Sequence, residues 1–278
     1  MARKRKKNNK NPIIIAIIAV LVLTLLGCFG SGDEALPETT LGHSEAINTT
    51  EESFFGNSAE DTGNDASDSE TATEEATKDI GVNSLKGDLP QFDGTPYVAV
   101  NGNEPEFTPD EITDKYFEIY EPLDRYGRCT VAFACLGRET MPTEERGEIG
   151  SVKPSGWHTV KYDCVDGKYL YNRCHLIGFQ LSGENANKRN LVTGTRYMNV
   201  EGMLPFENMV ADYIDETGNH VMYRVTPVFE GDDLVAKGVQ IEAYSVEDEG
   251  DGICFNVFCF NNQPGVIIDY ATGESVAE

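Results

Sequence analysis

The chain has 278 residues, enough for one or two domains, and its 47 acidic against 22 basic residues give a formal net charge of −25 at pH 7. A charge of this sign does not favour an anionic partner, so binding of a polyanion would need a locally basic surface. Composition changes along the chain and divides it into three unlike segments, residues 1–28, 29–89 and 90–278.

Residues 1–28 have the pattern of an export signal. The basic cluster MARKRKKNNKNP precedes an apolar run from Ile13 to Leu26, shorter than the about 20 residues that span a membrane. The motif LLGC at residues 25–28 resembles a bacterial lipobox, which would make Cys28 a lipidated N-terminus. An uncleaved membrane anchor is an equally open alternative. With either anchor, or after cleavage and release, the rest of the chain is expected on the extracellular side of a bacterial membrane.

Residues 29–89 are predicted to be a disordered acidic linker. From Ser31 onward the segment is rich in Ser, Thr, Glu, Asp, Asn and Gly, and Phe54 and Phe55 are its only aromatic residues. Such a composition buries too little apolar surface to offset the entropy lost on ordering. The linker would therefore tether the segment that follows.

Residues 90–278 are long enough for one domain with a sizeable core. Thr108-Pro109-Asp110-Glu111 has the N-cap, Pro and Glu of a helix start, and an apolar stripe follows it. Residues 128–136 indicate a buried strand. Residues 157–162 and 168–173 flank Asp166-Gly167, a hairpin signal, so that His175 would lie at a strand end.

The C-terminal part of this segment predicts one helix and a strand meander. Apolar residues recur at helical spacing from Phe206 to Ile214, and Gly218 follows as a stop. Four strands are expected at residues 222–229, 239–246, 253–260 and 266–270. The fold class is therefore α+β with a largely antiparallel central sheet.

The six Cys residues of this segment are interpreted as free. If residues 128–136 and 253–260 are strands, Cys129 and Cys135 lie about 20 Å apart and Cys254 and Cys259 about 17 Å apart. A disulfide needs Cα atoms within about 7 Å, so neither pair closes locally. Non-local bridges stay open. The absence of CxxC pairs argues against structural zinc.

Charge is unevenly distributed within this segment. Between Arg125 and Arg196 about eleven Lys and Arg residues face about seven Asp and Glu residues, whereas beyond Tyr197 acids dominate. A locally positive surface suits an anionic substrate, although chance clustering of solvated charges explains it equally well.

The stretch YNRCHLIG, residues 171–178, carries the strongest chemical signal. A His at a strand end beside an Arg can be a general base next to a phosphate-binding group, and it can also be structural. No phosphate-binding Gly loop, Ser nucleophile elbow or zinc-protease helix accompanies it. From the residues alone, a phosphodiester site is one of two open interpretations.

NRCHLIG, followed by KRNL and TGTRYMN, resembles the active-site run of the DNA/RNA non-specific endonucleases, which are ββα-metal or His-Me finger nucleases. It is most similar to the membrane-anchored DNA-entry nucleases of bacteria. The similarity extends more loosely from about Val98 to the C-terminal residues. It implies a ββα-metal fold and cleavage of both DNA and RNA, without use of the ribose 2′-OH.

The resemblance also implies roles for individual residues. His175 would be the base that deprotonates the attacking water, with Arg173 beside the scissile phosphate. Asn199 would be the metal ligand at the start of the finger helix, and Glu207 falls near the water shell of the metal. Asn190 matches a recurring Asn that holds the loop between the finger strand and the helix.

The cofactor implied is Mg²⁺, with Mn²⁺ as a substitute. Because Mg²⁺ keeps several waters, one Asn oxygen and the substrate phosphate form a sufficient site. Two positions depart from the family signature Asp-Arg-Gly-His: Asn172 replaces Asp, which would lower the rate, and Cys174 replaces Gly. Strand alternation predicts that Cys174 points into the core as a packing residue rather than a redox switch.

Four further basic residues are candidates for contacts with nucleic acid: Arg146, Arg196, Lys188 and Arg189. A solvated surface role is at least as compatible with Arg146 and Arg196. His158 and His220 are interpreted as structural. Two alternatives to an enzyme stay open, a nucleic-acid-binding surface lipoprotein made inert by Asn172 and Cys174, and an adhesin for other polyanions. Retention of both His175 and Asn199 argues against each.

Overall fold

The computed structural model describes residue 85 and residues 88–278. The predicted export signal, including Cys28, and most of the predicted linker lie outside these residues. Within the described part of the chain, no helix is both long enough and apolar enough to cross a membrane.

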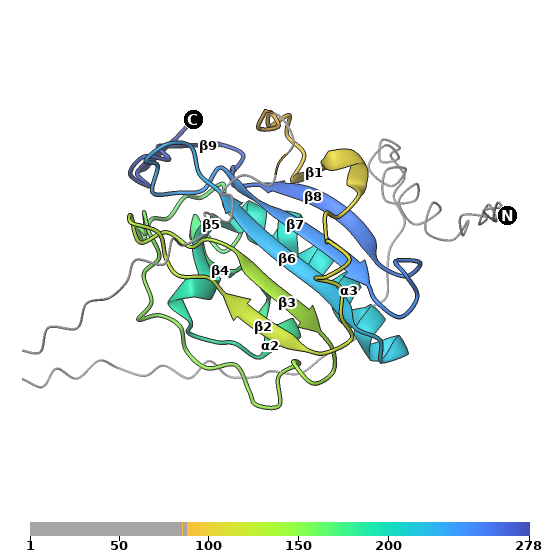
Figure 1. Ribbon diagram of the computed structural model, residues 1–278. Helices are drawn as coiled ribbons and strands as arrows, with labels where there is room; N and C mark the ends of the chain where they lie inside the picture. The colour runs from red at the N-terminus through yellow and green to blue at the C-terminus, as the bar shows by residue number, and fades with distance from the viewer. Residues whose placement is uncertain (1–84, 86–87) are drawn as a thin grey trace, which may run out of the picture. The chain divides into compact units, whose positions relative to one another are not determined.

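A six-stranded sheet forms the centre of the fold, and every neighbouring pair of strands in it is antiparallel (Figure 1). Its spatial order is β1-β8-β7-β6-β3-β2. In that order the strands are Tyr97–Ala99, Cys254–Phe260, Gly238–Ser245, Val221–Val228, Ala132–Leu136 and Phe117–Tyr120. The predicted α+β class is confirmed, and so are the first three strands of the C-terminal meander. The fourth, β9 (Val266–Ile268), pairs instead with β10 (Ser275–Ala277) in a separate two-stranded sheet.

Both faces of the central sheet are covered, so strands β6, β7 and β8 are buried almost throughout. On one face the main core includes Val210 and Ile214 of helix α3 (Leu204–Thr217). On the other face, Leu85, Leu89 and Phe92 pack against a smaller cluster of β-strand residues. Helix α3 ends as predicted at Gly218, which has a φ of 72° that Gly adopts without steric cost.

A two-stranded sheet and a helical segment form a separate ββα unit. Strand β4 (Tyr171–His175) pairs in antiparallel fashion with β5 (Leu191–Thr195). The short helix α2 (Phe179–Ser182) and the 3₁₀ turn η2 (Lys188–Asn190) lie between them. The wide helical turn η3 (Met198–Met203) then leads directly into α3. As predicted, His175 is the last residue of its strand.

Asn261 attaches this unit to the central sheet. It follows β8, is fully buried, and its side-chain Oδ1 accepts the backbone N–H of Thr195 at 2.7 Å. Its Nδ2 donates to the carbonyls of Thr193 at 3.0 Å and Ala236 at 2.9 Å. One amide therefore satisfies backbone groups of β5 that no neighbouring strand pairs with, and it fixes the unit's position.

Two local predictions are wrong. Thr108–Glu111 forms the capping contacts, with the Thr108 N–H donating to the Glu111 carboxylate at 2.7 Å, but no helix follows. The chain forms strand β2 instead, because residues 117–120 pair with β3 along the sheet edge. Tertiary pairing here outweighs a local helix signal.

The hairpin predicted around Asp166-Gly167 is also not formed as expected. Its first arm forms only one bridge, Lys161 with Tyr169, and β4 pairs with the later strand β5 instead. The predicted strand over residues 128–136 is confirmed only from Ala132 onward. All six Cys residues of the domain are free, as expected.

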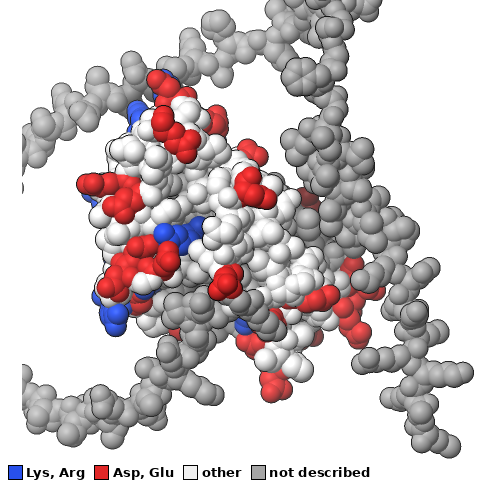
Figure 2. All heavy atoms as spheres, turned by 90° about the horizontal axis from the view of Figure 1, so that it is seen from above, with Lys and Arg blue, Asp and Glu red and all other residues white. Residues whose placement is uncertain are grey.

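One face of the molecule is largely acidic. On the face seen in Figure 2, Asp and Glu side chains are spread widely and few Lys or Arg side chains are visible. This agrees with the net charge of −25. A binding site for an anion must therefore be local.

We predict that Asn261→Ala lowers the free energy of unfolding by about 2–5 kcal/mol, because it leaves buried backbone groups of β5 without partners. Urea denaturation would measure the change. Asn262→Ala is the matched control, since Asn262 contributes its backbone carbonyl to Thr195 Oγ1, and it should change stability by less than about 0.5 kcal/mol. Equal effects of the two substitutions would contradict the assigned role.

Candidate active site

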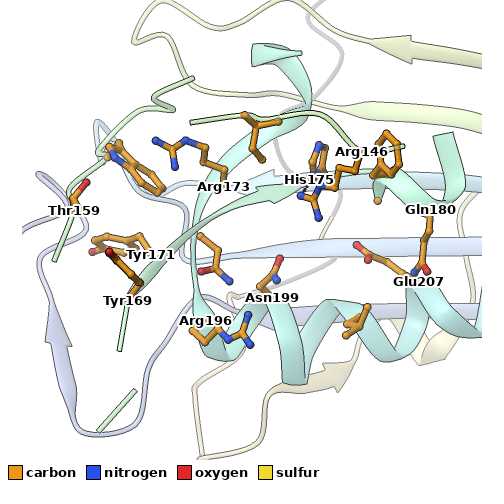
Figure 3. Close-up of a pocket in the computed structure, with 16 residues that line it drawn as sticks. Arg146, Thr159, Tyr169, Tyr171, Arg173, His175, Gln180, Arg196, Asn199 and Glu207 are labelled. Carbon is orange, nitrogen blue, oxygen red and sulfur yellow. Dashed lines mark hydrogen bonds between the residues drawn. The ribbon is translucent and has the colours of Figure 1, made fainter. Parts of the chain in front are cut away.

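A cavity of about 760 Å³ opens between β4, α2 and the η3–α3 segment. Tyr171, Arg173 and His175 alternate along β4 and line one side, whereas Asn199 of η3 and Glu207 of α3 line the other (Figure 3). The wide turn of η3 shows in the bond from the Leu204 N–H to the Asn199 carbonyl, five residues back.

The structure brings together seven residues singled out from the sequence. These are Arg146, Asn172, Arg173, His175, Arg196, Asn199 and Glu207. It does not bring Lys188 and Arg189 to the cavity, because turn η2 exposes both side chains elsewhere, with Arg189 directed to the Tyr120 carbonyl at 3.5 Å. Their assignment to the substrate groove is therefore not supported.

His175 is held in one orientation by a backbone group. Its Nε2 lies 2.8 Å from the carbonyl oxygen of Asn185, which can only accept a hydrogen bond. The proton of a neutral ring is therefore on Nε2, and the lone pair is on Nδ1. Nδ1 lies 3.5 Å from a guanidinium nitrogen of Arg146, a distance that allows only a weak contact.

Two effects lower the pKa of His175 below its ordinary value. Burial disfavours the charged ring, which is 6% exposed, and the positive charge of Arg146 acts in the same direction. The hydrogen bond to Asn185 opposes them. The ring is therefore neutral at neutral pH and able to accept a proton.

Glu207 is packed against a glycine of the helix α2 start. A Cβ added at Gly178 would lie 2.8 Å from Glu207 Oε2, so a larger residue there would require the carboxylate to shift. Burial raises the pKa of Glu207 to about 7, although Arg146 opposes this shift. The group therefore exchanges a proton near neutral pH.

Two arginines line the middle of the cavity. Arg173 donates to the carbonyls of Val152 and Gly150, and its guanidinium lies 4.0 Å from the centre of the Trp157 ring. Arg196 pairs with the exposed Asp166 at 2.9 Å. With Arg146 they give the cavity three cationic groups against the single carboxylate of Glu207.

Asn190 is fully buried and joins the two ends of the loop between β4 and β5. Its Oδ1 accepts the N–H of Ile177 at 2.9 Å, and its Nδ2 donates to the Ile177 carbonyl at 3.0 Å. The Leu176 N–H also donates to the Asn190 carbonyl at 2.9 Å. These bonds fix the backbone directly after His175.

Cys174 points away from the cavity. It is fully buried in the main core, and burial raises the pKa of its thiol far above the usual range. Its sulfur packs over Gly194, where an added Cβ would clash with Cys174 and with Met198. A protonated thiol in that position is a packing group. Asn172, the other departure from the family signature, lines the cavity.

Several residues of the site were not anticipated from the sequence. Asn185 acts through its backbone carbonyl, and Gly178 acts through its missing side chain, so neither has a side-chain signal. Trp157, Tyr169 and Gln180 also line the cavity. Of these residues, only Trp157 and Tyr169 had a signal in the sequence, because both are aromatic and lie in or near the predicted hairpin.

The donor atoms at the site suit a hard cation. Asn199 offers an amide oxygen and Glu207 a carboxylate on the same wall of the cavity, and oxygen ligands with free space for water are what Mg²⁺ prefers. Within residues 88–278 no cluster of three or more His, Cys, Asp or Glu side chains could hold a metal. A site with few protein ligands therefore fits the residues present.

Two strands followed by a helix, with a His ending the first strand and an Asn beginning the helical segment, define the class of ββα-metal nucleases. A family model described as DNA/RNA non-specific endonuclease matches residues 108–247, half of the chain. The chain belongs to that family.

Similar proteins agree with this assignment. NucA from Streptococcus agalactiae, solved with a magnesium ion bound, has 28% identity and a TM-score of 0.60, over 70% of this chain and 94% of that one. The Sda1 nuclease, solved with a bound zinc ion, has 24% identity and a TM-score of 0.57, over 66% and 97%.

A deoxyribonuclease of Streptococcus dysgalactiae subsp. equisimilis is 26% identical over 204 residues, which are 58% of this chain. The matched part spans about 61% of the length of that relative.

Proposed function

We propose that this protein is a magnesium-dependent endonuclease that hydrolyses phosphodiester bonds in both DNA and RNA, with Mn²⁺ able to replace Mg²⁺. The observation that carries the proposal is the geometry of His175. Its Nε2 is bound to the Asn185 carbonyl, which leaves the Nδ1 lone pair inside a cationic cavity that also contains Asn199 and Glu207. The magnesium ion bound to NucA supports the choice of metal.

In this proposal His175 is the general base. A water attacks the phosphorus while Nδ1 takes one of its protons, and the bond from phosphorus to the leaving 3′ oxygen breaks. The leaving oxygen takes a proton from a solvent water, and the imidazolium later releases its proton to solvent. The weak contact between Arg146 and Nδ1 is replaced when a phosphate oxygen accepts the guanidinium hydrogen bond. Substrate binding therefore frees the base.

The remaining residues stabilise charge. Arg173 and Arg196 lie where they would donate to phosphate oxygens, and this interaction strengthens as negative charge builds up. Asn199 would hold the metal through its amide oxygen, with Glu207 near its water shell. When bound, such an ion stabilises charge on the phosphate and on the leaving oxygen. Asn172 carries no charge to raise the basicity of His175, which would lower the rate. None of these contacts requires a ribose 2′-OH.

The proposed location is the extracellular face of a bacterial membrane. The basic cluster, the apolar run from Ile13 to Leu26 and the motif ending at Cys28 support export followed by lipid or helix anchoring. Residues 29–89 would then act as a tether that lets the domain reach extracellular nucleic acid.

We predict that His175→Ala lowers cleavage of supercoiled plasmid and of RNA by about 10²–10⁴-fold, because the base is lost. Its unfolding free energy should change by only about 1 kcal/mol, the value of one hydrogen bond. His220→Ala is the control, since that His contacts Glu247 outside the cavity, and it should cleave normally. A large loss of stability in His175→Ala with activity retained would make the His a core residue.

A second prediction concerns the metal ligand. Asn199→Ala should cut activity at low magnesium, and excess magnesium should restore part of it, because the lost oxygen weakens binding of the ion without removing the base. Asn219→Ala is the control, since its side chain donates to the Tyr213 hydroxyl outside the cavity. Titration of activity with MgCl₂ and with EDTA would measure the shift. Activity insensitive to EDTA would contradict a metal-dependent nuclease.

The pH profile gives a third prediction. At limiting magnesium the wild-type rate should rise from acidic pH to a plateau with a midpoint near 7, because Glu207, whose pKa burial raises to about 7 in the metal-free protein, must ionise before the ion binds. In Glu207→Gln only the neutral form of His175 is still required, so the midpoint should fall below about 6.5. An identical midpoint in both proteins would show that Glu207 does not control the profile.

A further inference from the structure

The cavity has a second end that the proposed chemistry does not use. Figure 3 shows Thr159, Tyr169 and Tyr171 gathered at the end opposite His175 and Glu207, with Arg173 and Arg196 between the two ends. Trp157 also lines this cavity. An aromatic wall thus continues directly from the cationic, catalytic part of the site.

Tyr169 presents an open ring rather than a core side chain. It is 47% exposed, although it lies beside Leu170 and Tyr171, which are both buried in the neighbouring core. The Lys161 ammonium lies 4.3 Å from the centre of its ring. A cation over one face orients the ring and leaves the other face available.

The other two aromatic rings are held in place. Arg173 covers one face of Trp157 at 4.0 Å, and the Tyr171 hydroxyl donates to the Gly273 carbonyl at 2.9 Å. These contacts fix the wall before any ligand binds. A preformed aromatic surface loses little conformational freedom on binding.

The spacing along β4 matches a chain of nucleotides. Tyr171, Arg173 and His175 are alternate residues, so each is about 6.6 Å from the next at about 3.3 Å per residue. A phosphate at Arg173 would place the attached sugar and base toward Tyr169 and Tyr171. The scissile phosphate and its neighbouring base would then occupy opposite ends of one cavity.

We propose that Tyr169 stacks an unpaired nucleobase next to the scissile phosphate, in a subsite where Trp157 also lines the cavity and the buried Tyr171 supports the wall from the core. This inference rests on the proposed nuclease function. Bases inside a duplex are stacked on each other and cannot reach a protein ring, so the subsite acts on single-stranded or locally opened nucleic acid. Stacking tolerates any base because every base has a π-face.

The chain supplies its own reporter for the test. Trp157 is its single Trp residue, so tryptophan fluorescence reports directly on the cavity. Binding would be followed in the full chain carrying His175→Ala, which keeps the substrate uncut, with magnesium present. The two probes are an oligothymidylate and a fully abasic sugar-phosphate strand of equal length.

The oligothymidylate should bind more tightly than the abasic strand, by about 5–150-fold for one stacked base. Adding Tyr169→Ala should remove this difference, whereas Tyr169→Phe should keep it because the ring and not the hydroxyl binds. Tyr116→Ala, which removes an exposed Tyr beside β2 and outside the cavity, should change neither affinity. Thermal melting would verify that each variant is folded.

Two outcomes would overturn the subsite. One is equal binding of both strands by the parent protein, and the other is an equal loss for both strands in Tyr169→Ala, which would mean a purely electrostatic or structural role. Plasmid and RNA cleavage by the wild-type chain, assayed in parallel, separates the two proposals. Cleavage without base-dependent binding rejects only the stacking subsite, whereas failure to cleave either substrate rejects the nuclease and the subsite with it.

Discussion

The buried amide of Asn261 is the interaction on which the site depends most. Strand β5 has β4 on one side only, so its other edge would bury backbone groups without partners if Asn261 were absent. The same amide reaches Ala236, next to β7. Asn261 therefore holds the ββα unit in position against the central sheet, although its side chain does not line the cavity.

Much of the fold could be predicted because its signals are local. The alternation of apolar residues in β6 to β8, the helical spacing before Gly218 and the position of His175 at a strand end are readable from short windows of sequence. The helix predicted from Thr108 is absent because the capping contacts form only a single turn, and residues 117–120 then pair with the edge of β3. Which strand pairs with β4 is likewise decided by contacts distant in sequence.

The residues of the candidate site also differ in whether a local sequence signal identifies them. Side chains with distinctive chemistry, such as His175 and Asn199, could be picked out through a motif. Asn185 and Gly178 could not, because one contributes a carbonyl that every residue has and the other contributes empty space. Lys188 and Arg189 were expected in the substrate groove because they are basic, but both side chains are exposed elsewhere. The sequence gives their charge and does not give the direction in which the turn points their side chains.

The contact between Cys174 and Gly194 has a consequence for how this sequence can vary. The two residues lie on paired strands, with Gly194 two residues beyond Val192, the register partner of Cys174, and the sulfur occupies the volume that a side chain at position 194 would need. Sizes at the two positions are therefore coupled. With Gly at position 174, position 194 would lose one of its two close neighbours, and the Met198 methyl would still limit its size. A larger residue at position 194 therefore needs smaller or shifted side chains at both positions 174 and 198.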